Sequence, residues 1–270
     1  MKIFSICLIK NEADVIESCL SEASKWSDRV FVYDNGSTDG TWEKVCAMRN
    51  DIIVPWKSDT RAFNDCVRGD VFHEFRHEAA DGDWWCRLDA DESYVQDPRA
   101  FLSKVPPRYH VVWGVAIEYF ITRQDVEQCQ FTGDFARDIK NIQHYRAVNS
   151  EARFFKYRRR LKWNSNGSWP THLGLTYPER ILLRHYQFRS PQQMQLRIET
   201  RRQTRKVGST LYWDIEDSVT WRDKLQDASV LHLDDGNGSY VIDEAHLPDH
   251  LQNVFIRMLK FLMHGLKIWP

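Results

Sequence analysis

The strongest constraint on the fold of this chain is an alternation of short apolar runs with helical patterns in its N-terminal part. Residues 2–9, 29–33 and 51–56 are rich in apolar, β-branched and aromatic side chains, and they predict strands. Between them, 11–24 and 41–48 carry apolar residues at helical spacing. Strands that alternate with helices form parallel sheets, so we expect an α/β fold with a Rossmann-like, mostly parallel sheet flanked by helices.

The same pattern continues into the middle of the chain. Residues 62–80 predict a helix, 84–88 a strand, and the long apolar run 111–121 a central strand. Beyond it the signal weakens, because 124–149 is polar and aromatic and predicts a loop-rich cap, whereas 151–163 predicts an Arg-rich hairpin strand.

The character of the chain changes near Ser190. Residues 191–206 form a strongly charged helical pattern, and the last forty residues also look helical. We therefore expect one main α/β domain over 1–190. A helical extension over 191–270 should pack on the same domain.

Composition limits the classes of partner. The chain has 270 residues, of which 42% are hydrophobic, and this is long enough to bury a sizeable core. A formal net charge of -1 gives no general attraction to nucleic acid, so an anionic ligand must be held by local positive charge or by metal. The six cysteines show no C-x-x-C pair and are expected to be reduced thiols.

The apolar runs also bear on localisation. The apolar start of the chain is too short for a signal peptide, and no apolar run is long enough to cross a membrane, which predicts a cytoplasmic protein. Residues 253–270 are amphipathic, and they predict a peripheral contact with the inner face of a membrane.

Asp89-Ala90-Asp91 follows the predicted strand at 84–88 and is the central chemical feature of the sequence. In an extended stretch residues i and i+2 point to the same side, so both carboxylates can face one divalent cation. Carboxylate oxygens suit Mg²⁺ or Mn²⁺, which keep free positions for substrate phosphates. Such a triplet also occurs in solvated turns, but the carboxyl end of a strand in an open α/β sheet is where ligands bind.

Asp34 follows the predicted strand at 29–33 and begins the turn-rich stretch DNGSTDG. A carboxylate placed there can accept hydrogen bonds from a base or a ribose, and Gly36 and Gly40 let the backbone approach a ligand closely. The alternative is a turn in which a polar residue of this stretch caps the next helix, and both roles are compatible.

Three segments in this order, ICLIKNEADVIESCL, VFVYDNGSTDGTWE and WWCRLDADESY, resemble the start of a glycosyltransferase family 2 enzyme with the GT-A fold. The resemblance runs over roughly residues 1–120. It implies a metal-dependent, inverting transfer of a hexosyl-type sugar from a nucleotide-sugar donor, with a UDP-sugar favoured, to a glycan or lipid-linked acceptor. It also implies a role in cell-surface polysaccharide or lipopolysaccharide synthesis.

The resemblance assigns roles to particular residues. In this family the end of the first strand and the Asp after the second strand bind the base and ribose, and the corresponding residues are Leu8, Lys10, Asn11, Glu12 and Asp34. The D-x-D binds diphosphate and metal, which corresponds to Asp89 and Asp91 with Mn²⁺ or Mg²⁺. A basic residue before the D-x-D is also implied, and Arg68 is favoured over Arg61.

Two histidines are candidates for a further metal ligand. Several family members place a His-Glu pair after a basic, aromatic strand, and His172 corresponds to it, although Leu173 stands in place of the Glu. His185 is the second candidate, because GT-A enzymes of several families use a His on the C-terminal side as a ligand. A packed, hydrogen-bonded role is the alternative for either residue.

An inverting transfer needs a general base near the acceptor hydroxyl, usually a carboxylate. The region expected to line the acceptor cleft contains four candidates, which are Glu118, Asp134, Asp138 and Glu151. The sequence does not choose among them.

Two other functions compete with sugar transfer. A sugar-nucleotide nucleotidyltransferase also uses an α/β sheet with metal-binding acids, but it needs a Gly-rich basic loop after the first strand, where this chain has KNEADVIE. A nucleotide-binding scaffold protein with a degenerate GT-A site is the other alternative, and Leu173 is the residue that favours it.

Overall fold

The computed structural model describes residues 1–61, 64–206 and 216–270. One mixed sheet runs through this part of the chain in the order β3-β2-β1-β4-β7-β6-β8-β5, and β9 pairs with β7 outside this path. The strands are β1 (Ile3–Ile9), β2 (Arg29–Asp34), β3 (Ile53–Ser58), β4 (Trp84–Asp89), β5 (Glu92–Tyr94), β6 (Val111–Phe120), β7 (His144–Lys156), β8 (Ile181–His185) and β9 (His232–Leu233).

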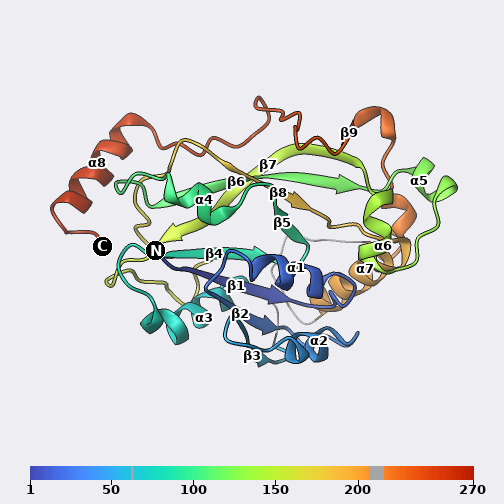
Figure 1. Ribbon diagram of the computed structural model, residues 1–270, viewed down its shortest axis with the longest axis horizontal. Helices are drawn as coiled ribbons and strands as arrows, with labels where there is room; N and C mark the ends of the chain where they lie inside the picture. Colours follow the sequence, from blue (N-terminus) through green and yellow to red (C-terminus); the bar gives the residue numbers. More distant parts are fainter. Residues whose placement is uncertain (62–63, 207–215) are drawn as a thin grey trace.

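Helices flank this sheet and close its ends (Figure 1). The α-helices are α1 (Ile16–Ala23), α2 (Thr41–Ala47), α3 (Val67–Phe75), α4 (Pro98–Ser103), α5 (Arg123–Gln128), α6 (Phe135–Asp138), α7 (Pro191–Lys206) and α8 (Val254–Gly265). Short 3₁₀ turns are η1 (Arg76–Glu78), η2 (Ile139–Asn141), η3 (Trp221–Lys224) and η4 (Ala228–Val230). In Figure 1, α7 and α8 lie at opposite ends of the long axis.

The sheet begins as the parallel arrangement that the sequence predicts. β1 pairs in parallel with β2 and β4, and β2 pairs in parallel with β3. Every residue of β1 is buried, as expected for a strand covered on both faces. Ile3 and Cys7 pack with Ile16 and Leu20 of α1 on one face. On the other face, the aromatic and aliphatic side chains of β1 pack against α3.

The second half of the sheet corrects the expectation of a mostly parallel arrangement. β7 is antiparallel to both β4 and β6, and β5 is antiparallel to β8, whereas β6 and β8 are parallel. Antiparallel neighbours need no crossover helix, so the short α5 and α6 are enough to join β6 to β7. The fold is therefore α/β and Rossmann-like with a mixed sheet.

Several element boundaries also differ from the sequence prediction. The helix predicted over 62–80 forms only as α3, because the Asn64 side chain accepts a hydrogen bond from the Cys66 N–H and favours a local turn. Ala62 and Phe63 lie outside the described residues. The strand predicted over 151–163 begins earlier, within the expected cap, because β7 is fixed by its pairing with β6 rather than by local pattern.

The C-terminal eighty residues contain more than helices. α7 has the predicted bounds, but of the last forty residues only α8 is an α-helix. Between them, Asp235 and Asn237 accept backbone hydrogen bonds two residues ahead, and such turns compete with helix formation. β9 adds to the sheet through the pairing of Leu233 with His144.

Candidate functional site

The register of the parallel strands brings the ends of β1, β2 and β4 to one level of the sheet. Ile9 lies opposite Asp34, and Leu8 lies opposite Asp89. The chain then leaves β1 through Lys10. The carboxyl ends of neighbouring parallel strands form the ligand-binding edge of an open α/β sheet. Two of the predicted acidic residues therefore lie at the edge where the sequence places them.

The two aspartates of the D-x-D are paired with cations from distant parts of the chain. Asp89 ends β4, and Asp91 stands in the turn before β5. Arg68 of α3 donates to Asp89 Oδ1 over 2.6 Å, and Arg153 of β7 donates to Oδ2 over 3.2 Å. Burial favours a higher pKa for Asp89, but Arg68 and its neighbours hold that pKa well below the usual range. Asp89 is therefore a carboxylate.

Arg153 is a buried cation that joins three carboxylates. Its Nη1 and Nη2 donate to the two oxygens of Glu92 over 2.8 and 2.5 Å, a bidentate pair. Nη2 also lies 2.8 Å from Oε1 of Glu151. Arg153 thus connects β5 to β7 directly behind Asp89.

His185 ends β8 and meets Asp91 through the register of the mixed sheet. It lies opposite Glu92 on β5 and opposite Glu118 on β6. Its Nε2 lies 3.5 Å from Asp91 Oδ2, and its Nδ1 lies 3.8 Å from Glu118 Oε1. Glu118 is held in turn by Asn149, whose Nδ2 donates over 2.7 Å.

The charge states of this pair depend on each other. Burial lowers the pKa of His185, but Asp91 and Glu118 outweigh it and raise that pKa to about 10. Burial favours a higher pKa for Asp91, but His185 and then Arg197 hold it well below the usual range. Without a bound cation, the pair is therefore an imidazolium facing a carboxylate.

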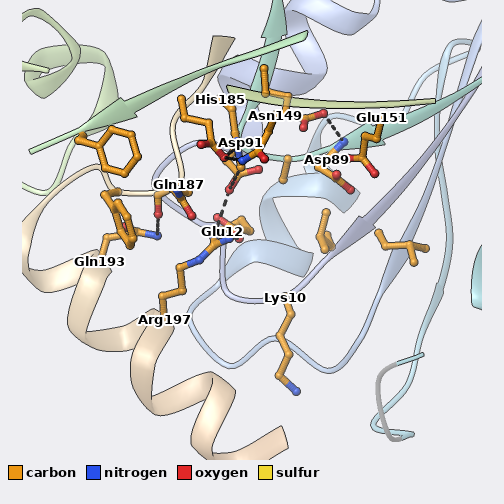
Figure 2. A pocket seen from close by; sticks show the side chains of 18 of the residues that line it. Lys10, Glu12, Asp89, Asp91, Asn149, Glu151, His185, Gln187, Gln193 and Arg197 are labelled. Carbon is orange, nitrogen blue, oxygen red and sulfur yellow. Dashed lines mark hydrogen bonds and ion pairs between the residues drawn. The ribbon is translucent and has the colours of Figure 1, made fainter. Parts of the chain in front are cut away.

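A second cluster of acids and arginines adjoins Asp91 where the chain leaves β1. Arg189 is buried and donates to Asp14 over 2.7 and 2.9 Å, and it also pairs with Glu12. Arg197 of α7 donates to Asp91 over 3.1 Å and lies 3.6 Å from Glu12. Burial raises the pKa of Glu12 to about 7, although Arg189 opposes this effect. Figure 2 shows Asp91 between His185 and Glu12, with Arg197 reaching toward them.

Most of these groups line one large cavity of about 1240 Å³. Residues from β1, β4, β6, β7, β8 and α7 form its wall. The predicted site residues on this wall are Leu8, Lys10, Asn11, Glu12, Asp89, Asp91, Glu118, Glu151 and His185. The fold thus brings most of the predicted donor-site residues to one cavity with two of the four predicted bases.

Two predicted nucleotide-binding residues lie behind the cavity wall. The Asp34 side chain is fully buried and accepts hydrogen bonds from Ser58 and from the turn at Gly36 and Ser37. It holds the turn after β2 with its own carboxylate, but the expectation that a polar residue of this stretch caps the next helix is wrong, because the N-cap of α2 is Gly40. Arg68 is buried too, and it reaches the cavity only through its contact with Asp89.

Three predicted site residues lie outside the cavity wall. Asp134 caps α6, and Asp138 accepts hydrogen bonds from the backbone of Thr132 and Gly133. His172 has a positive φ of 56°, and its ring stacks on Trp269 at 4.5 Å. Each of these residues has a structural contact of its own, and none is among those that line the cavity.

Sequence patterns did not reveal the arginines that neutralise the acidic residues. Arg153 stands among apolar neighbours in β7, and a charge at an inward-facing strand position is the one sequence signal for it. Arg189 lies just before α7, which begins with a Pro. Arg197 lies within α7, and the many charged residues of this helix gave no sign that one of its faces points into the protein.

The arrangement places acidic side chains next to Arg197 and His185 at the cavity wall, but it offers few protein ligands for a metal. Among the residues that the structure describes, no three or more His, Cys, Asp or Glu side chains come together as a metal-binding group. Asp91 and His185 together offer one oxygen and one nitrogen. No protein-family model matches this chain, and no curated protein matches it.

Proposed function

We propose that this protein is a metal-dependent glycosyltransferase with the GT-A fold. It transfers a sugar from a nucleotide-diphosphate sugar, with a UDP-sugar favoured, to a glycan or lipid-linked acceptor with inversion. The observation that carries the proposal is the meeting of Asp91 and His185 at 3.5 Å, beside Asp89, at the carboxyl edge of the parallel strands. A nucleoside diphosphate and its cation require such groups at this edge of the sheet, namely two D-x-D carboxylates and a His from later in the chain.

The nucleotide is assigned to the β1 side of the cavity. Leu8, Lys10 and Asn11 line this side, next to the turn that Asp34 holds. The Asn11 side chain accepts a hydrogen bond from Thr38 N–H over 2.9 Å, so the loops after β1 and β2 are joined. The volume of about 1240 Å³ exceeds the usual small-molecule pocket, so donor and acceptor share it.

Asp91 and His185 fit the needs of Mn²⁺ or Mg²⁺, because such ions are often held by one or two protein groups with phosphate and water oxygens completing the shell. Asp91 provides the carboxylate, His185 the second ligand, and Asp89 a nearby negative charge. When bound, the cation supplies positive charge next to the leaving diphosphate. Arg197 stands beside Asp91 and adds a second positive charge for the same anion.

Glu151 is the candidate base with access to an acceptor. The Glu151 side chain is 46% exposed at the cavity wall, whereas the Glu118 side chain is 11% exposed and held between Asn149 and His185. A general base must reach the acceptor hydroxyl directly. In this proposal Glu151 removes the proton, and the hydroxyl oxygen attacks the anomeric carbon as the bond to the diphosphate breaks. Glu118 instead orients His185.

A catalytically silent nucleotide-binding protein is the second candidate, and one observation favours it. Asp89 and Asp91 are both already paired with guanidinium groups, from Arg68 and Arg153 in one case and from Arg197 in the other. Such pairing can replace a metal as the partner of the carboxylates. This candidate predicts nucleotide binding without turnover.

Release of nucleoside diphosphate from a panel of nucleotide sugars separates the two candidates. The glycosyltransferase proposal predicts release with one donor, faster with Mn²⁺ than with a chelator, and at background rate for Asp91→Asn. Lys25→Gln, at an exposed pair just after the end of α1, is the matched control and should release at the wild-type rate. Nucleotide binding with no release from any donor would favour the silent protein.

A further inference from the structure

Helix α8 presents its apolar side to solvent. Its most exposed large side chains are Val254 at 70%, Phe255 at 76%, Met258 at 67% and Phe261 at 63%. These positions recur at the spacing of one helical face. An amphipathic helix of a folded domain normally turns that face toward the core, so the orientation of α8 is inverted.

Polar contacts hold the opposite side of α8 against the body of the protein. Lys260 Nζ donates to the Gly174 carbonyl over 2.9 Å. The ring of His264 lies 5.0 Å from that of His110, which precedes β6. Arg160 donates to the carbonyl of Lys267 just after the helix. The orientation is therefore fixed by specific contacts, and it leaves the apolar side available for a partner.

We infer that α8 attaches the protein to the surface of an anionic lipid membrane. Residues 253–270 contain Arg257, Lys260 and Lys267 but no Asp or Glu. The neighbouring loop, which contacts this segment through Arg160, adds the exposed cations Arg159 and Lys162. An apolar helix face with cations beside it suits the boundary between acyl chains and anionic headgroups.

The charge and length of α8 favour a membrane surface over the alternatives. In a twofold pair of copies, two surfaces with the same positive charge around their apolar faces would lie against each other, and like charges repel. An anionic bilayer supplies the opposite charge instead. A helix of 12 residues is too short to span a bilayer, and no helix among the described residues meets the length and apolarity needed for a span.

Attachment through α8 leaves the cavity accessible. α7 contributes Arg197 to the cavity wall and lies at the opposite end of the long axis from α8 (Figure 1). The bilayer would therefore contact the molecule at the end that is far from α7 and its part of the cavity wall. Attachment through α8 would be the same whatever reaction the cavity performs.

Flotation with lipid vesicles tests the inference. The full chain should bind phosphatidylcholine vesicles that contain phosphatidylglycerol, bind pure phosphatidylcholine far more weakly, and lose affinity as salt rises. The double variant Phe255→Asp, Phe261→Asp should weaken binding by roughly tenfold or more, because both apolar contacts are lost. Val230→Asp, at an equally exposed apolar residue outside α8, should bind as the wild type does.

A second variant separates loss of binding from loss of folding. Arg257→Gln leaves the apolar face unchanged and should reduce binding to anionic vesicles at low salt. Circular dichroism and thermal melts show whether each variant is folded. No binding of the wild type to anionic vesicles would overturn the inference. A dimer in solution that the Phe255→Asp, Phe261→Asp variant dissociates, without vesicle binding, would overturn it in favour of a second copy.

Discussion

The imidazole Nε2 of His185 lies 3.5 Å from Oδ2 of Asp91, and this contact joins the end of β8 to the turn after β4. Strand register creates it, because His185 is opposite Glu92, the residue that follows Asp91. The contact is therefore a property of the sheet rather than of a flexible loop. It is the geometric basis of the proposed cation site.

His185→Gln tests whether this histidine serves the cation. The substitution removes the imidazole that faces Asp91 but keeps a polar side chain of similar length. We expect the Mn²⁺ concentration for half-maximal nucleotide binding to rise about tenfold to a hundredfold, the usual cost of a disturbed metal shell. His246→Gln, at an exposed histidine in a surface pair, is the control. An unchanged Mn²⁺ requirement would remove His185 from the site.

Arg153→Met tests the buried ion pairs behind the cavity. The substitution leaves the carboxylate of Glu92, 1% exposed, without its bidentate partner. Breaking a buried pair from one side costs about 3–5 kcal/mol, so the free energy of unfolding in urea should fall by that amount. Arg137→Met removes an exposed pair with Asp134 and should cost less than about 1 kcal/mol. Equal losses for the two variants would contradict the account.

Glu151→Gln tests the assignment of the base. The amide is close in shape to the carboxylate but cannot take the acceptor proton, so the transfer rate should fall about 10²- to 10⁴-fold while nucleotide affinity stays near that of the wild type. Glu118→Gln should instead change the Mn²⁺ requirement, because Glu118 faces His185. Full transfer activity in Glu151→Gln would exclude Glu151 as the base.

The stability of the protein should decline below neutral pH partly through His110. Burial, with Arg158 and His264 adding to it, lowers the pKa of His110 to about 2, against 6.5 for the unperturbed side chain. Its Nδ1 accepts a hydrogen bond from the Leu175 N–H over 3.3 Å, which requires the unprotonated nitrogen. Below pH 6.5 the unfolded chain therefore binds a proton that the folded chain does not, and the folded state loses stability as pH falls.

His110→Asn should remove this part of the pH dependence. The loss is at most about 1.4 kcal/mol per pH unit for one proton, and it spreads over the range from pH 6.5 downward. Urea unfolding between pH 7 and pH 4 should give a shallower slope for the variant than for the wild type. Parallel slopes would show that His110 does not titrate on unfolding.

The sequence was sufficient to predict the parallel half of the fold and the acids at its edge. Strands buried on both faces read as continuous apolar runs, and Asp34 and Asp89 end two such runs, so their place at the carboxyl edge follows from local pattern alone. The positions of His185 and Glu118 depend on the register of β8 with β6, which no local pattern specifies.

The sequence was insufficient to assign the role of a charged side chain whose partner lies far along the chain or in its own turn. Arg153 neutralises Glu92 across strands that are far apart in the chain, and only the tertiary fold reveals this pairing. Asp138 looked like a candidate base, but it satisfies the backbone of Thr132 and Gly133 within its own turn.

Calorimetric titration of nucleoside diphosphates into the wild type and Asp91→Asn, with and without Mn²⁺, tests the central claim most directly. The account predicts that one nucleotide binds the wild type, that Mn²⁺ strengthens this binding at least about tenfold, and that Asp91→Asn loses the effect of Mn²⁺. Binding that is the same with and without Mn²⁺, or the same in Asp91→Asn, would contradict a cation site at Asp91. No binding of any nucleotide would contradict the glycosyltransferase proposal as a whole.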